Sequence, residues 1–167
     1  MKRWKPLWWC ACAVIALLVP AAAGAEQLAK HGSYAGKLVW FERGTVMSVD
    51  KDYFFKEAPQ QGLFLNAAGS GFLHSAVFTC GSQGYVQNDQ FSFSGYCIAT
   101  DKEGDKAVFK WACARGGDRC VGGFDWVSGT GKYSGIRGHS QFDAGQIAEG
   151  PLGAIGDSNL KGEWNLP

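Results

Sequence analysis

Four of the six cysteines lie in two pairs, each placed symmetrically about a tight-turn signal, and this spacing constrains the fold more than any other feature. Asn88-Asp89 stands midway between the members of the first pair, and Gly116-Gly117 midway between those of the second. Such dipeptides form two-residue turns between antiparallel strands. Residues directly opposite each other across a hairpin have Cα atoms about 4.5–5.5 Å apart, which a disulfide accepts. We therefore predict two hairpin disulfides: Cys80–Cys97 and Cys113–Cys120.

The stretch from Ser33 to Phe142 is rich in glycine and aromatic residues and has no helical periodicity, so it predicts an all-β domain. Turn signals such as Asn-Asp, Gly-Gly and Gly-Thr-Gly separate short strands. Gln60-Gln61 and the Gly/Ala/Pro-rich segment Gln146–Gly156 are expected to be loops. The candidate strands are Tyr34–Phe41, Thr45–Val49, Tyr53–Phe55, Leu63–Asn66, Phe72–Cys80, Gly84–Gln87, Gln90–Thr100, Lys106–Ala114, Cys120–Ser128, Lys132–Phe142 and Asn159–Trp164.

Alternation along these strands sorts the side chains onto two faces, because successive residues of a strand point to opposite sides. One face is apolar over successive strands, as in a meander that packs on a core or closes into a barrel. A polar row on the last long strand is a solvated face or part of an oligomer interface: Tyr133, Arg137, His139 and Gln141. The apolar face comprises Phe72, His74, Ala76, Phe78, Cys80, Val86, Phe91, Phe93, Cys97, Ala99, Phe109, Trp111, Cys113, Cys120, Phe124, Trp126, Ile136 and Phe142.

The start of the chain is typical of a secretory signal peptide. Basic residues precede the apolar run Leu7–Val19, and Ala23-Gly24-Ala25 matches a signal peptidase site, so residues 1–25 are predicted to be removed. The apolar run is shorter than the roughly 20 residues of a spanning helix, and no membrane partner is expected after cleavage. Residues 26–167 then suit one domain. Their even number of cysteines favours an oxidising compartment, either the periplasm or the exterior of the cell.

Charge and motifs argue against several function classes. Removal of residues 1–25 removes three of the 16 basic residues and none of the 15 acidic ones, so the formal net charge changes from +1 to −2. This balance does not predict a nucleic-acid partner. The remaining sequence has no nucleophile elbow, phosphate-binding loop, Cys-x-x-Cys or paired metal-binding histidines, so neither a metal nor a cofactor is expected. Asp101–Asp105 has its glycine fourth rather than sixth, which favours a polar turn over a calcium loop.

Three segments carry a resemblance to a known family: Gly95-Tyr-Cys97-Ile-Ala-Thr100-Asp101-Lys-Glu-Gly104-Asp105-Lys106, Phe109-Lys-Trp111 and Gly129-Thr-Gly131-Lys-Tyr133-Ser-Gly135-Ile136-x-Gly138. The chain resembles bacterial exported members of the allene oxide cyclase barrel-like superfamily, which is related to plant dirigent proteins. The resemblance covers the region from Cys80 to Phe142. It implies a single eight-stranded antiparallel β-barrel with an apolar lumen, often found in dimers or trimers. The matching residues are turns and structural glycines, and no functional residue of the plant enzymes is carried over.

Six residues are candidates for a ligand site inside such a barrel: His74, Phe93, Phe109, Trp111, Phe124 and Trp126. Ligand sites are mostly apolar with a few polar groups, but a small eight-stranded barrel can also be filled by its own side chains. His74 is the one histidine assigned to the apolar face. We interpret it first as a hydrogen-bonded core residue and second as a group that orients a ligand or moves a proton.

Three functions follow from these observations. The first is non-catalytic binding of a small apolar molecule in the lumen. The second is an isomerase or cyclase that confines an apolar substrate, with His74 as its polar participant. The third is a structural or interaction protein with a filled barrel, which acts through its outer face. A ligand-sized lumen would separate the first two from the third.

Overall fold

The computed structural model describes residues 28–116 and 118–167, so the predicted signal peptide at residues 1–25 lies outside the described residues. The described chain consists of strands and one short 3-10 turn. Its elements are β1 (His31–Glu42), β2 (Thr45–Ser48), β3 (Tyr53–Glu57), β4 (Gln60–Asn66), β5 (Val77–Gln87), β6 (Gln90–Thr100), β7 (Lys106–Gly116), β8 (Arg119–Gly129), η1 (Gly131–Tyr133), β9 (His139–Gly150) and β10 (Gly153–Asn165).

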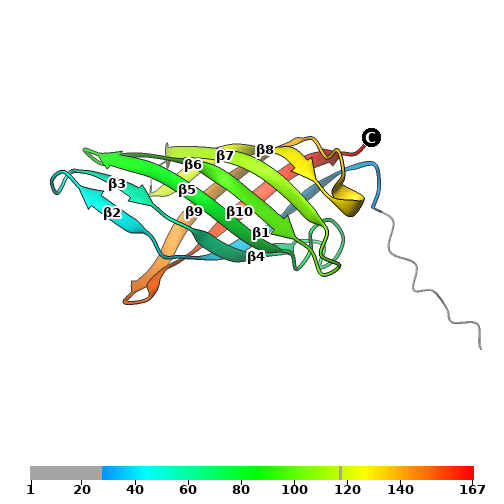
Figure 1. Cartoon of the computed structure of the whole chain (residues 1–167), viewed down its shortest axis with the longest axis horizontal. Helices are drawn as coiled ribbons and strands as arrows, with labels where there is room; N and C mark the ends of the chain where they lie inside the picture. Colours follow the sequence, from blue (N-terminus) through cyan, green and yellow to red (C-terminus); the bar gives the residue numbers. More distant parts are fainter. Residues whose placement is uncertain (1–27, 117) are drawn as a thin grey trace, which may run out of the picture.

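Eight of the strands form a closed antiparallel barrel, which confirms the predicted fold class. The ring runs β5-β4-β1-β10-β9-β8-β7-β6, and pairing of β6 with β5 closes it. The hairpin of β2 and β3 lies outside the ring, because β3 pairs with the last residues of β5 and β4 pairs with the first. This hairpin therefore extends one end of the barrel, at the left of Figure 1.

Both predicted disulfides are present, although the second does not use the predicted register. Cys80 and Cys97 are directly opposite each other across the hairpin of β5 and β6, as expected. In the β7–β8 hairpin, however, Cys113 is opposite Gly122, so it bonds diagonally to Cys120 with Cα atoms 5.5 Å apart. A Cβ at Gly122 would collide with Cys113, so glycine permits this approach. The register differs from the prediction by two residues, which leaves every side chain on its predicted face.

Several predicted element boundaries are wrong. Residues 72–76 are a turn rather than strand, because Leu73 and Ser75 adopt positive φ angles of 52° and 62°. The predicted strand Lys132–Phe142 begins only at His139, after η1. The predicted loops at Gln60-Gln61 and at Gln146–Gly156 are strand residues of β4 and of the β9–β10 hairpin. Their polar and small residues have weak strand propensity, and pairing with strands on both sides overrides it.

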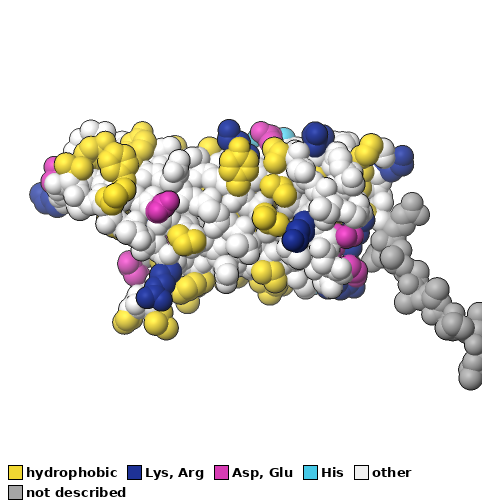
Figure 2. Space-filling view, viewed as in Figure 1, with side chains coloured by type: hydrophobic (Ala, Val, Ile, Leu, Met, Phe, Trp, Pro, Cys, Tyr) yellow, Lys and Arg dark blue, Asp and Glu magenta, His cyan; other side chains and the backbone are white. Residues whose placement is uncertain are grey.

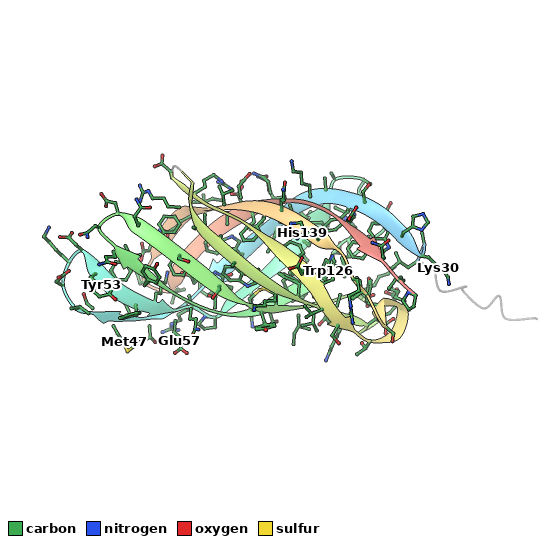
Figure 3. The ribbon with its side chains drawn as sticks, turned by 90° about the horizontal axis from the view of Figure 1, so that it is seen from above. Lys30, Met47, Tyr53, Glu57, Trp126 and His139 are labelled. Atoms are coloured by element: carbon green, nitrogen blue, oxygen red, sulfur yellow. A yellow bond between two sulfur atoms is a disulfide. The ribbon has the colours of Figure 1, made fainter. Side chains whose placement is uncertain are left out.

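The predicted apolar face points into the barrel, and every residue assigned to it is buried or half-buried. At one end the lumen is filled with side chains. Phe72, from the turn that follows β4, stacks on Trp164 with ring centroids 4.3 Å apart. Trp126 packs beside them, in the right half of Figure 3, with Tyr133 and Ile136. We call this the closed end.

Tyr133 corrects the predicted polar row. It is only 2% exposed and belongs to the core, because η1 breaks the alternation of a strand and turns the ring inward. Arg137, His139 and Gln141 are exposed, as expected. Hydrophobic side chains also lie on the outer surface, notably on the β2–β3 hairpin, where Val46 and Met47 are exposed (Figure 2). No helix in the described residues is long and apolar enough to cross a membrane.

Candidate ligand cavity

The end of the barrel opposite the closed end contains a cavity of about 280 Å³. It lies between the last residues of β1 and β7 and the first residues of β4, β6 and β8, so its mouth is at the end of the barrel that carries the β2–β3 hairpin. None of the rings that stack at the closed end contributes to its wall. The lumen is therefore half filled and half open.

Seven aromatic rings line the cavity. Phe109 and Phe124 lie at its inner end, with ring centroids 4.3 Å apart. Trp111 packs edge-on against Phe142 with centroids 6.0 Å apart. These rings face inward because successive residues of each strand point to opposite faces of the sheet. The aromatic side chains that line the cavity are Trp40, Phe91, Phe93, Phe109, Trp111, Phe124 and Phe142.

Trp40 shows how the local sequence shapes this wall. The indole lies over Gly156 of the neighbouring strand β10, where any Cβ would collide with it. The indole N–H donates to the Ser158 Oγ at 3.1 Å, which satisfies the buried donor and holds the ring against the wall. All four bonded cysteines also line the cavity. The two disulfides thus connect β5 to β6 and β7 to β8 at the wall itself.

Polar side chains gather at the mouth. The Glu42 carboxylate, 8% exposed, forms an ion pair with the Lys56 Nζ and accepts a hydrogen bond of 2.7 Å from the Gln60 Nε2. These three residues come from β1, β3 and β4, and all three line the cavity. We call them the mouth cluster. The other polar residues that line the cavity are Asp118, Gln146 and Ser158.

The structure brings together four of the six residues predicted to bind a ligand: Phe93, Phe109, Trp111 and Phe124 line the cavity. Trp126 instead belongs to the packed closed end and is 2% exposed. His74 lies in the turn before β5 and outside the cavity, where its Nδ1 accepts a hydrogen bond from the backbone N–H of Asn66 at 3.2 Å. The hydrogen bond fits the first interpretation of His74, a hydrogen-bonded core residue, although the residue is only half-buried.

Sequence reasoning missed the mouth cluster. Glu42 continues the inward series of β1, which includes Tyr34, Leu38 and Trp40, so alternation applied to this strand would have pointed to it. Lys56 and Gln60 had no comparable signal. Lys56 lies on a strand outside the ring, and Gln60 was assigned to a loop.

The cavity offers a ligand apolar contacts along its wall and polar contacts at the mouth cluster. In residues 28–116 and 118–167, no three His, Cys, Asp or Glu side chains are grouped as metal ligands. His139 pairs with Asp125 at 2.8 Å on the exposed outer face. Shifted pKa values occur elsewhere in the barrel, as at Tyr34, where burial raises the pKa of the phenol well above its usual range.

Solved structures similar to this chain include two dirigent proteins. The pterocarpan synthase dirigent protein GePTS1 matches with a TM-score of 0.48 and 11% identity, over 84% of this chain and 90% of that chain. The pterocarpan synthase dirigent protein PsPTS1 matches with a TM-score of 0.45 and 11% identity, over 84% of this chain and 97% of that chain. At 11% identity, both likenesses concern the fold alone. No protein-family model and no curated protein matches the sequence.

Proposed function

We propose that this protein binds a small, largely apolar ligand in the open half of its barrel and does not transform it. The observation that carries the proposal is the aromatic-lined cavity of about 280 Å³. A cavity of roughly 150 Å³ holds one benzene molecule, so this one suits a ligand of about two rings or a chain of similar volume. A barrel that acted only through its outer face would have no need for this space.

Binding without catalysis is favoured by the groups that face the cavity. The charges of the pair at its mouth, Glu42 and Lys56, neutralise each other within the protein. The alternative of an isomerase or cyclase depended on His74, whose ring nitrogen is hydrogen-bonded outside the cavity. We further propose that the protein works in the periplasm or outside the cell, because two disulfides suit an oxidising compartment.

Native mass spectrometry of the oxidised protein, purified from its own host, tests binding directly. We expect an additional mass that is retained under native conditions and released on denaturation. Its value would give the mass of the ligand. The proposal is overturned if the protein carries no additional mass and also fails to bind added naphthalene, an apolar probe of suitable size.

Filling the cavity should abolish binding. Ala144 lines the cavity, whereas Ala112 is exposed on the outer face of β7. We expect Ala144→Leu to weaken naphthalene binding by about tenfold or more, because the added side chain occupies space that the probe needs. Ala112→Leu adds the same atoms outside the barrel and should leave affinity unchanged. Fluorescence titration of both variants makes the comparison, and equal affinities would locate the probe elsewhere.

A further inference from the structure

The mouth cluster is a group of interacting polar side chains, two of them charged, in a largely apolar wall. The Glu42 carboxylate is buried, whereas the side chain of Lys56 is 24% exposed. A buried carboxylate is costly unless it is paired, and here it has one cationic and one amide partner. The cluster is therefore an organised feature of the cavity and not a solvated surface pair.

The cluster retains unused hydrogen-bonding capacity. A carboxylate offers about four acceptor positions, and Lys56 and Gln60 occupy two of those on Glu42. An ammonium group offers three donors, and the bond to Glu42 uses one of those on Lys56. An acceptor and a donor thus lie side by side at the edge of the aromatic wall.

Charge selects among the groups that could use this site. Glu42 and Lys56 together are neutral, so a charged ligand head would leave an excess charge beside a buried ion pair. A hydroxyl group adds no charge, and it can donate to the carboxylate while it accepts from the ammonium. Asp118, the other charged residue of the wall, is exposed on the rim, where water and salt screen it.

We infer that the ligand is an amphipathic alcohol, with its apolar body against the aromatic wall and its hydroxyl group on Glu42 and Lys56. This inference rests on the proposed function and specifies the chemical class of the ligand. Gln60 acts as a positioning residue, since it holds the carboxylate through the Oε2 that Lys56 does not use.

The test compares three probes with the same body: 1-octanol, octanoate and octylammonium. Their affinities are measured by calorimetry for the wild type, for Glu42→Gln and for Lys56→Gln. Each variant exchanges one charged group for an amide, so it removes one charge from the cluster and keeps a side chain that can form hydrogen bonds. Affinities are expressed relative to 1-octanol, which cancels the general preference of an apolar cavity for uncharged molecules.

We expect the wild type to prefer 1-octanol. Glu42→Gln should raise the relative affinity for octanoate by roughly tenfold, because it leaves Lys56 without a counter-charge. Lys56→Gln should do the same for octylammonium, because it leaves Glu42 unpaired. The matched control is Lys37→Gln, since Lys37 pairs with Asp157 at 2.7 Å on the outer face. This control should leave all three affinities unchanged.

Unchanged relative affinities in both variants would overturn the inference, as would naphthalene binding without 1-octanol binding. In either case the proposed function would stand, because an apolar probe still binds. Failure of naphthalene and of all three octyl probes would instead contradict the proposed function. If one variant does not fold, the wild type alone still tests the inference. The inference is also overturned if the wild type does not prefer 1-octanol to both charged probes.

Discussion

At the scale of single residues, the closed end depends on one buried polar contact. The Tyr34 hydroxyl and the Ser140 Oγ are 2.7 Å apart, and both residues are buried among aromatic rings. Burial raises the pKa of Tyr34 despite the opposing hydrogen bond to Ser140, so the phenol remains neutral under physiological conditions. Burial removes both hydroxyl groups from water, and each provides the hydrogen-bond partner that the other would otherwise lack.

Removal of either hydroxyl group should destabilise the protein, and the two losses should not add. We expect Tyr34→Phe to lower the free energy of unfolding by about 1–3 kcal/mol, because it leaves the Ser140 hydroxyl buried without a partner. In the double variant Tyr34→Phe/Ser140→Ala, the loss should be smaller than the sum of the single losses by about 1 kcal/mol. Urea unfolding of the four proteins in the cycle measures this coupling. Strict additivity would show that the contact contributes nothing specific.

At the scale of elements, the loop between β6 and β7 is attached to η1 by charge. Lys132 Nζ lies 2.6 Å from Asp101 Oδ2 and 3.0 Å from Glu103 Oε2. The other Asp101 oxygen accepts the backbone N–H groups of Glu103 and Asp105, each at 3.0 Å. Burial alone would raise the pKa of Asp101, but its hydrogen bond to Lys132 and the charge of Lys132 outweigh burial and hold this pKa below its usual value.

This lowered pKa predicts a loss of stability in acid. The folded protein holds the Asp101 carboxylate more strongly than the unfolded chain does, so its contribution is complete above the ordinary pKa of about 3.9. The contribution falls as pH decreases through the lower folded value. Asp101→Asn should therefore be less stable than the wild type at neutral pH, and the difference should shrink below about pH 4. Denaturant unfolding across this pH range measures the difference in stability. A difference independent of pH would argue against a stabilising ion pair between Asp101 and Lys132.

At the scale of the whole molecule, the barrel has two halves with different packing. Phe72 is buried in the stacked closed end, whereas Phe93 is half-buried and faces the cavity. The same truncation should have different consequences in the two halves, because only the closed end surrounds the removed ring on all sides.

We expect Phe72→Ala to lower the free energy of unfolding by about 3–5 kcal/mol, and Phe93→Ala by about half of that or less. The two variants remove identical atoms, so each serves as the control for the other in guanidinium unfolding. Phe93→Ala should in addition weaken binding of naphthalene, since the ring belongs to the cavity wall. Equal losses of stability would mean that the open half is as tightly packed as the closed half.

The all-β class, both disulfide pairings and the inward face of the strands could be predicted from the amino acids alone. These features follow from local rules, namely turn chemistry and the alternation of side chains along each strand. The pairing Cys113–Cys120 could be predicted even though the register was two residues off, because that error preserves the face of each side chain. Four of the predicted ligand residues line the cavity for the same reason.

Which part of the lumen is open could not be predicted from the sequence, because it depends on how distant segments pack in the folded barrel. The turn that carries Phe72 and the segment around Tyr133 fill one end, and neither follows the alternation of a strand. The mouth cluster forms because three strands meet at this end of the barrel. β1 pairs with β4, and both β3 and β4 pair with the same side of β5. Such pairings join segments far apart in the chain, and their energy depends on closure of the whole barrel. No local pattern in the sequence reports that energy.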